Sequence, residues 1–375
     1  MALAIDLDNN ATTPALPEAV AAVIEAMAPQ IANPSSSHRH GRVARTLVDR
    51  ARDEVAVILG ARAEQVVFTS GATEGNAAVL RAHQERLLLS LPGGHPSLVA
   101  GHGGRREEVS VDENGIADLC HLRDVVEANS DAVLAVSMVS GETGVIQPVR
   151  EICEIAAAAG VPTLIDQAQA VGRVPADLLD CGAIYRTASA HKMNGPKGVG
   201  CLVLADGARV PPMAAGGGQE SGRRSGTENV PGIAGFGAAS RVRMATLAED
   251  LGRMSAMRDG LERRIVEALP FVRVNGSSAP RAVTTTSLTF VGVDGMALVA
   301  RLDAAGVLCS QISACSSGRP EPSVALMSMG LSESDAFSTI RLSVSVMTDR
   351  DTLDEAANVI VREAGFLHDI MGGAA

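Results

Sequence analysis

Residues 187–200 read TASAHKMNGPKGVG, so that a lysine, Lys192, follows a serine and a histidine and precedes a glycine-rich turn. The apolar run 201–205 that comes next predicts a buried strand. Lys192 would then lie at the edge of a core, where burial lowers the pKa of an amine and makes it a usable nucleophile. Taken alone, a lysine in a surface turn is the simpler interpretation. The patterns elsewhere in the chain favour a functional role for Lys192 instead.

Strands and helices alternate on both sides of this segment. A strand over 65–69 leads through the turn SGATEGN (70–76) into a helix, and a strand over 163–165 ends at Asp166. This alternation predicts an α/β fold with a mostly parallel, doubly wound sheet. Such sheets bind ligands at the carboxyl ends of their strands, and helix N-termini bind phosphate. Asp166 and the turn are therefore candidate site elements, although each could also be a plain helix cap.

The length of 375 residues allows two domains. A helical pattern of apolar residues crosses 247–265, and we place a boundary near it. We predict a large domain over 15–255 and a smaller α+β domain formed by 1–14 and 256–375. In the smaller domain, Cys315 lies in the segment SACSSGRPEP (313–322). A lone cysteine is more often buried and inert, but this small-residue segment is unsuited to a core and favours a reactive thiol.

The composition disfavours several classes of protein. A net charge of -11, 2% aromatic residues and no basic block argue against a nucleic-acid partner. The six cysteines form no CxxC pair, which argues against a zinc site or a disulfide framework and predicts no bound metal. No apolar run reaches about 18 residues and no signal-peptide pattern opens the chain. We therefore expect a cytoplasmic protein without a membrane span.

Seven motifs in order give the chain its resemblance to a known family. They are DNNATTP (8–14), NPSS (33–36), TSGATE (69–74), DQAQ (166–169), SAHK (189–192), RSGTEN (224–229) and SACSSG (313–318). Together they resemble the class I, nitrogen-fixation-type cysteine desulfurases, which are fold type I pyridoxal-phosphate (PLP) enzymes of the aminotransferase class V family. The resemblance runs nearly end to end. It implies a homodimer with a large PLP-binding domain and a small domain that carries the catalytic cysteine.

The resemblance implies a role for each residue that would hold the cofactor. Lys192 would hold PLP as a Schiff base, Asp166 would pair with the ring nitrogen, and Gln169 would hydrogen-bond the phenolic oxygen. His95 would stack on the ring and serve in proton transfer. The phosphate would be held by Ala72, Thr73, Ser189 and His191, and by Thr227 of the partner subunit.

The resemblance also implies the substrate and the reaction. Arg341 would bind the carboxylate of L-cysteine through a bidentate pair, with Asn33 as a further substrate-binding residue. The Cys315 thiolate would attack the substrate sulfur, releasing alanine and leaving a persulfide on Cys315. A sulfur-acceptor or scaffold protein would then take the sulfur for iron–sulfur clusters or another thio-cofactor.

The chain departs from the pattern of the family at Gly141, at Ile312 and at residues 345–346. Gly141 replaces an asparagine that contacts the cofactor and the substrate carboxylate, which would cost about 1.5–3 kcal/mol if one hydrogen bond to a charged group is lost. Ile312 replaces a glycine before Ser-Ala-Cys, and residues 345–346 are Ser-Val instead of Gly-Arg. These departures keep two alternatives open: a PLP-dependent selenocysteine lyase or other lyase on cysteine-like substrates, and a degenerate paralogue that acts as a scaffold.

Overall fold

The computed structural model describes residues 4–311 and 321–372. Its largest sheet has seven strands in the order β2-β8-β7-β6-β5-β3-β4. Strand β8 is antiparallel to β2 and β7, and the other neighbours are parallel. The predicted α/β fold with a mostly parallel sheet is thus confirmed. The strands are β2 Val66–Thr69, β3 Leu87–Ser90, β4 Arg106–Glu108, β5 Ala132–Ser137, β6 Thr163–Asp166, β7 Tyr185–Ser189 and β8 Gly200–Leu204.

Helices cover both faces of this sheet because its strands are apolar on both sides. Successive side chains of a strand point to opposite faces. Phe68 and Leu89 accordingly pack in a core with helices on one face, whereas Val67 and Leu88 pack on the other face with α3 (Ala72–Ala82). The helices of the first face are α1 Pro17–Ala26, α2 Arg39–Ile58, α4 Leu119–Ala128, α5 Val149–Ala158 and the first half of α6.

Strand β3 lies in a stretch, 87–111, whose sequence pattern is loop-rich. Its four residues, LLLS, are all buried between β5 and β4. A strand buried on both faces shows no alternation of polar and apolar residues, and four residues are too few to distinguish it from a loop entering the core. The local pattern therefore misses this strand, which lies next to the edge strand β4.

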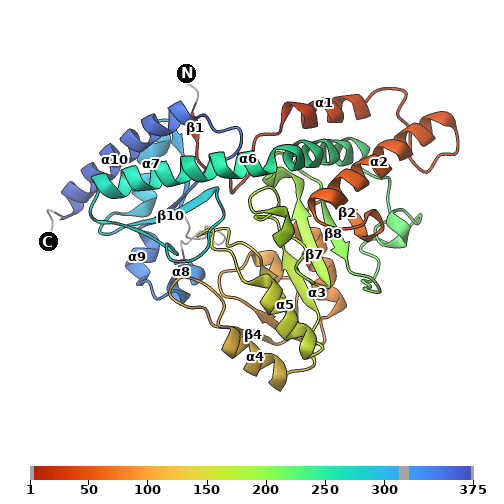
Figure 1. The fold of residues 1–375 in the computed structure, drawn as a ribbon, viewed down its shortest axis with the longest axis horizontal. Coiled ribbons are helices and arrows are strands. Elements are labelled where there is room, and N and C mark those ends of the chain that lie inside the picture. The colour runs from red at the N-terminus through yellow and green to blue at the C-terminus, as the bar shows by residue number, and fades with distance from the viewer. Residues whose placement is uncertain (1–3, 312–320, 373–375) are drawn as a thin grey trace.

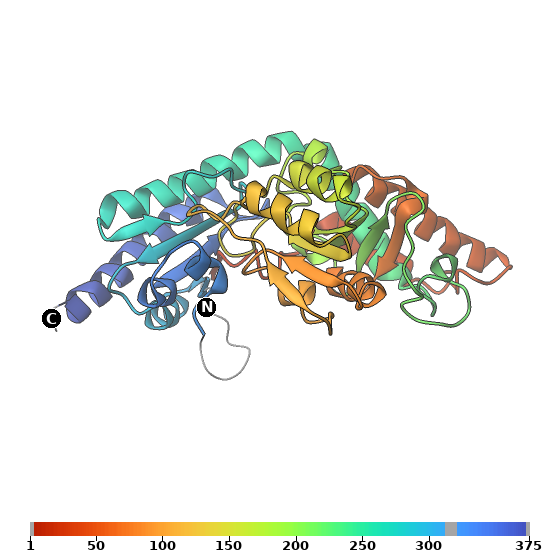
Figure 2. The same ribbon diagram turned by 90° about the horizontal axis from the view of Figure 1, so that it is seen from below.

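A second part of the molecule holds two smaller sheets. Four antiparallel strands follow the order β12-β13-β10-β9, and β1 pairs in parallel with β11. Both ends of the described chain therefore lie in this part, beside the small sheet rather than the large one (Figure 1, Figure 2). Its elements are β1 Ile5–Asp6, β9 Val272–Val274, β10 Thr285–Phe290, β11 Val307–Leu308, β12 Ser310–Gln311, β13 Thr339–Ser343, α7 Gly295–Ala304, α8 Val324–Ser328, α9 Glu333–Phe337 and α10 Arg350–Gly372.

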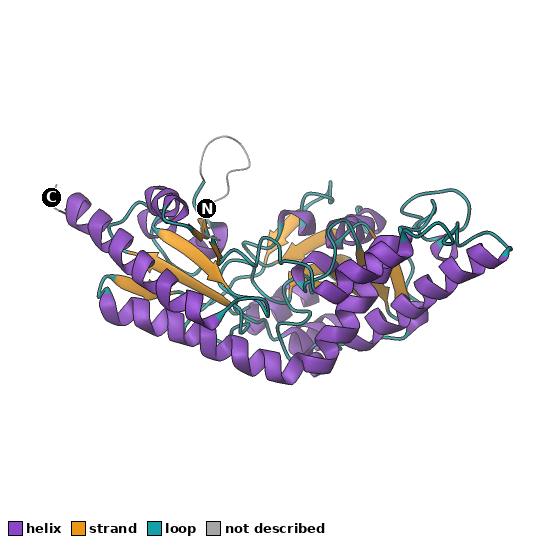
Figure 3. Cartoon of the chain, turned by 90° about the horizontal axis from the view of Figure 1, so that it is seen from above, coloured by secondary structure: helices purple, strands orange, loops and turns teal. Residues whose placement is uncertain are grey.

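One helix, α6 (Val230–Ala268), joins the two parts and runs for 39 residues along one side of the molecule (Figure 1, Figure 3). The Asn229 side chain caps its start by accepting a hydrogen bond from the backbone of Gly232 at 3.1 Å. Phe236 in its first half packs in the core of the large sheet, and Leu261 in its second half packs in the core of the small sheet. The boundary placed at 255 falls within α6 and stays a prediction.

Among residues 4–311 and 321–372, no helix has both the length and the apolar content needed to cross a bilayer. In the same ranges, no three histidine, cysteine, aspartate or glutamate side chains are grouped so that they could hold a metal ion.

Candidate active site

A cavity of about 520 Å³ opens where three parallel strands of the large sheet end. Ser137, Asp166 and Ser189 are the last residues of β5, β6 and β7, and all three line it. Ser310 and Gln311 of the small sheet also line it, so both parts of the molecule contribute. Nine residues singled out in the sequence come together here: Ala72, Thr73, His95, Asp166, Gln169, Ser189, His191, Lys192 and Arg341.

Three other sequence-predicted residues are not placed in this cavity. Asn33 is exposed, and its side chain accepts a hydrogen bond from the backbone of Ser35 at 2.8 Å. Thr227 is exposed on the loop before α6. Cys315, like Ile312, lies outside the described residues. The roles given to Asn33, Thr227 and Cys315 therefore stay predictions.

Lys192 ends the short turn that follows β7, and its amine faces the N-terminal segment. The Nζ atom donates to the carbonyl of Ala11 at 3.0 Å and to the carbonyl of Asn10. Burial is the main cause that lowers the pKa of the amine to about 8; the positive charges of Arg173 and Arg341 act in the same direction, and the carboxylates of Asp166 and Asp8 oppose them. A substantial fraction of the amine is therefore neutral near pH 8.

His191, the neighbour of Lys192, is also held in its neutral form. Burial is the main cause that lowers the pKa of its imidazole to about 4, followed by the charges of Lys192, Lys197 and Arg173. Its Nδ1 atom lies 3.2 Å from the hydroxyl oxygen of Thr12. The ring therefore offers hydrogen bonds without adding a full charge at neutral pH.

A chain of hydrogen bonds joins Asp166 to His95 through two buried side chains. The Nδ2 group of Asn76 donates to Asp166 Oδ2 and to Ser97 Oγ, each at 2.9 Å. Ser97 Oγ lies 2.7 Å from His95 Nδ1, and the Ser97 backbone donates to the same nitrogen at 3.2 Å. Because Nδ1 accepts that backbone hydrogen bond, a neutral His95 carries its proton on Nε2.

The start of α3 forms one wall of the cavity. Ala72 and Thr73 line it, and the backbone N–H of Ala72 donates to Ser189 Oγ at 2.9 Å. Gly200 permits this packing, because a Cβ atom there would lie 2.4 Å from the carbonyl oxygen of Ala188 and 2.7 Å from the Cα atom of Gly71. A helix N-terminus beside hydroxyl and imidazole groups is a site for an anion such as phosphate.

Arg341 also lines the cavity, and two of its five N–H groups have hydrogen-bond partners in the described part of the chain. Its guanidinium pairs with Asp8 at 2.7 Å and donates to the carbonyl of Gly141 at 3.0 Å. The Nε atom is buried and has no hydrogen-bond partner among the described residues. Gly141 leaves space beside it, since an added Cβ would meet nothing closer than Gln169 Nε2 at 3.6 Å. The second N–H of each Nη group can therefore bind a carboxylate.

Glu142 adds a titratable carboxyl to the lining. Burial raises its pKa from 4.5 to about 7, although the Ser323 hydroxyl and the charge of Arg341 oppose that rise. Ser323 donates to Glu142 and caps α8 by accepting from the backbone of Leu326 at 3.1 Å. Glu142 thus links the turn after β5 to the start of α8.

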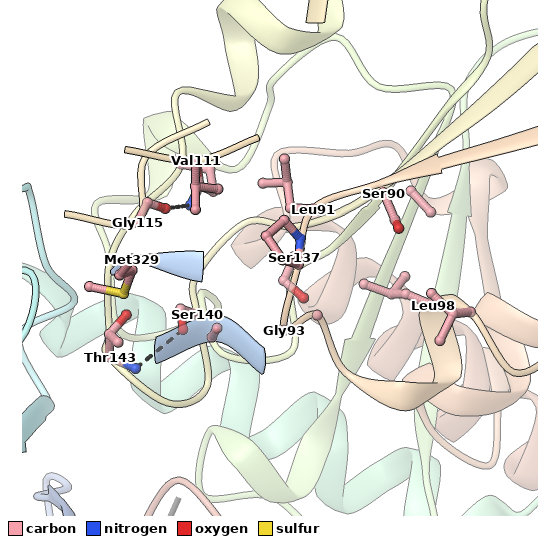
Figure 4. A pocket seen from close by; sticks show the side chains of 16 residues that line it. Ser90, Leu91, Gly93, Leu98, Val111, Gly115, Ser137, Ser140, Thr143 and Met329 are labelled. Carbon is pink, nitrogen blue, oxygen red and sulfur yellow. Dashed lines mark hydrogen bonds between the residues drawn. The ribbon is translucent and has the colours of Figure 1, made fainter. Parts of the chain in front are cut away.

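A smaller cavity of about 40 Å³ adjoins the large one and shares Gly93, Gly94 and Ser137 with it. Figure 4 shows Leu91, Leu98 and Met329 around this space. Gly93 contacts α8 closely, because a Cβ atom there would lie 2.3 Å from the Cβ atom of Ala325. The small cavity lies between strands β3 and β5 of the large sheet and helix α8.

Sequence reasoning missed three residues of the site. Asn76 lies inside the quoted turn SGATEGN, Glu142 follows Gly141, and Arg173 comes four residues after Gln169. Each of these residues lies next to a motif that the sequence analysis identified, and this proximity is the sequence feature that could have indicated a role in the site. Their hydrogen-bond partners lie far away along the chain: Asp166 for Asn76, Ser323 for Glu142 and Asn9 for Arg173.

Comparison with known proteins gives the family to which this chain belongs. Residues 5–355 match the family model for aminotransferase class-V. The chain belongs to this family of PLP-dependent enzymes. It is 35% identical to cysteine desulfurase 2 of Trichormus variabilis, over 95% of this chain and 92% of that protein. It is 36% identical to a cysteine desulfurase of Rhodobacter capsulatus, over 95% of both chains.

Solved structures agree with this placement among the cysteine desulfurases. A NifS-like protein from Rickettsia africae superposes with a TM-score of 0.88 at 29% identity, covering 98% of this chain and 99% of that one. A structure described as SspA in complex with cysteine superposes with a TM-score of 0.77 at 25% identity, covering 92% of this chain and 100% of that one.

Proposed function

We propose that this protein is a PLP-dependent cysteine desulfurase that converts L-cysteine to L-alanine and collects the sulfur as a persulfide on Cys315. The observation that carries the proposal is the gathering of Lys192, Asp166 and Arg341 in one cavity. They supply a reactive amine, a carboxylate and a cation, in a chain whose relatives are named cysteine desulfurases. The related structure described as a complex with cysteine supports L-cysteine as the substrate.

The charges that line the cavity fit PLP. Lys192 would hold the cofactor through its amine, and Asp166 would pair with the ring nitrogen and keep it protonated. Gln169 would hydrogen-bond the phenolic oxygen, since Nε2 has two hydrogens and only one is donated to the Asn10 carbonyl, at 3.0 Å. The start of α3, with Ser189 and His191, would hold the phosphate. When bound, PLP supplies an electron sink for the bonds at the α-carbon of the substrate.

The other residues would orient L-cysteine and move its protons. Arg341 would bind the substrate carboxylate, because it lines the cavity and each of its Nη groups has a second N–H beyond the one given to Gly141 or Asp8. Lys192 would take up the α-proton and return it, a task that suits an amine whose pKa is about 8. His95, held by Ser97 and through it by Asn76, would stack on the ring and serve in proton transfer.

Sulfur would leave through Cys315. Its thiolate would attack the substrate sulfur, so that an S–S bond forms as the C–S bond breaks and the electron pair stays on the substrate carbon, which is protonated to give alanine. Both flanks of the segment that carries Cys315 support this role. Gln311 lines the cavity on one side, and Ser323 binds the cavity residue Glu142 on the other.

Two protein partners belong to the proposal. A sulfur-acceptor or scaffold protein would take the persulfide sulfur for iron–sulfur clusters or another thio-cofactor. A homodimer would complete the phosphate site with Thr227 of the partner subunit. Support for the dimer comes from the exposure of Thr227 and from the nearby Arg224, which pairs at 3.1 Å with Glu74 in the first turn of α3.

One observation favours a second candidate function on the same scaffold. The open space at Gly141 adjoins Arg341, where the family pattern has an asparagine. A PLP-dependent lyase that acts on selenocysteine or another cysteine-like substrate would use the same Lys192 and Asp166. A scaffold without activity is disfavoured, because the residues needed for chemistry share one cavity.

The test measures alanine release from L-cysteine together with visible absorption of the protein. Cys315→Ala should keep the absorption of bound PLP and release no alanine, whereas Lys192→Ala should lose both. Matched controls are Cys309→Ala, because burial raises the pKa of that thiol to about 12, and Lys197→Ala, because that amine is exposed. Both controls should behave as wild type. Wild type that binds PLP but releases no alanine would refute the desulfurase and lead to selenocysteine as the next substrate.

A further inference from the structure

Arg173 contacts the backbone of Lys192 and is almost completely enclosed, with 4% of its surface exposed. All of its N–H groups are engaged. Its Nε and Nη2 atoms donate to the carbonyl of Lys192 at 3.1 and 2.7 Å, and Nη2 also donates to the carbonyl of Asn9 at 2.8 Å. Its Nη1 atom donates to Asn10 Oδ1 at 2.5 Å and to Gln169 Oε1. One guanidinium therefore gathers four residues of the site.

None of these acceptors is a carboxylate. Two other arginines near the site do have carboxylate partners: Arg243 pairs with Asp250, and Arg341 pairs with Asp8. Burial, with the charges of Arg341 and Arg243, lowers the pKa of Arg173 to about 9, so the side chain keeps its proton at neutral pH. A buried charge without a counter-ion is costly to fold, which points to a use for that charge.

The Arg173 guanidinium contacts the backbone of Lys192 directly and its amine indirectly, through Asn10. It binds the backbone carbonyl of Lys192 directly, and it binds the side chain of Asn10, whose backbone carbonyl accepts the Lys192 amine. The charged groups that face the amine are Arg173 and Arg341, which favour its neutral form, and Asp166 and Asp8, which favour its charged form.

We propose that Arg173 is a positioning residue for Lys192: it fixes the lysine backbone and the segment that receives the amine, and its uncompensated charge disfavours the protonated form of that amine. A neutral amine can react with a carbonyl group and accept a proton; a charged one can do neither. The inference rests on the proposed function only for the task given to Lys192. The test below reads the amine itself and uses no cysteine.

The chain suits a direct measurement because it contains two lysines, Lys192 and the exposed Lys197. The full-length protein, freed of carbonyl compounds with hydroxylamine, is acylated with trace acetic anhydride between pH 6.5 and 9.5. Peptide mass spectrometry then gives the acylation of Lys192 relative to Lys197 in the same sample. The variants are Arg173→Met and Arg173→Gln, which remove the charge, and Arg173→Lys, which keeps it. Arg186→Met is the control, since Arg186 is also buried but binds the carbonyls of Leu59 and Leu179.

We expect the two uncharged variants to shift the acylation midpoint of Lys192 upward. A shift of about one pKa unit lowers the neutral fraction about fivefold at pH 8 for an amine that titrates there. Arg173→Lys and Arg186→Met should keep the wild-type midpoint. Circular dichroism shows which of the two uncharged variants folds, and the acylation of a folded variant is compared with that of wild type.

Three outcomes would overturn the proposal. The first is an unchanged midpoint in the uncharged variants. The second is an equal rise in Arg173→Lys, which would assign the effect to packing and water entry instead of charge. The third is a wild-type Lys192 profile that coincides with that of Lys197. An inactive desulfurase with the expected acylation profiles would refute the proposed function and leave this inference standing.

Discussion

Replacing Glu142 by glutamine is expected to stabilise the folded protein above pH 7 and to change it little at pH 5. Burial raises the pKa of this carboxyl from 4.5 to about 7. The folded state therefore holds one more proton than the unfolded state between these values. By linkage, the stability from this group is complete below pH 4.5 and is lost as the pH rises through about 7.

The magnitude follows from the size of that pKa change. Each pKa unit corresponds to about 1.36 kcal/mol, so a rise from 4.5 to about 7 costs the folded state up to about 3 kcal/mol above pH 7. Partial exposure of the side chain reduces this, and we expect a gain of about 1–3 kcal/mol for Glu142→Gln. Glutamine keeps an oxygen that can accept the Ser323 hydroxyl, so the cap of α8 is preserved.

The assay is denaturant unfolding at pH 5 and pH 8.5, at one protein concentration, for wild type, Glu142→Gln and Glu127→Gln. Glu127 is exposed on α4 and serves as the control. Taking the difference between variant and wild type at each pH removes the contributions of other titrating groups. A stability difference of equal size at both pH values would refute the reasoning, and so would a larger gain at pH 5.

Three further predictions test the geometry of the site. Gly93→Ala should lower stability by more than about 1 kcal/mol in denaturant unfolding, because φ is 69° and the added Cβ meets Ala325, whereas Gly103→Ala, which meets nothing within 4 Å, should not. Asn76→Ala should weaken PLP binding in equilibrium dialysis. The variant removes the hydrogen bond from Asn76 to Asp166, and each buried polar group left without its partner costs about 1–3 kcal/mol. An unchanged affinity for PLP would contradict this prediction. Arg341→Lys should raise KM for L-cysteine about tenfold to hundredfold by losing a charged hydrogen bond, and an unchanged KM with normal PLP absorption would remove Arg341 from substrate binding.

The sequence predicts those parts of the fold and the site whose signals are local. The alternation that ends a strand at Asp166 is visible in the chain, and so is the glycine-rich turn after Lys192. Strand β3 is not, because four buried residues carry no periodicity. Arg173 is missed for a different reason. An arginine four residues after Gln169 becomes meaningful only when Asn9 and Lys192 are brought against it from distant parts of the chain.

The single helix α6 determines where the molecule can bend. The backbone passes between the two cores through α6 and through residues 8–16. Because α6 is a continuous helix of 39 residues, it resists bending. Any rocking of one core against the other would therefore be taken up in the second crossing. That crossing contains Asp8 and Asn10, the partners of Arg341 and Arg173. A movement of the small sheet would thus reach Lys192 through these contacts. The position of the Lys192 amine would therefore change with the angle between the two cores.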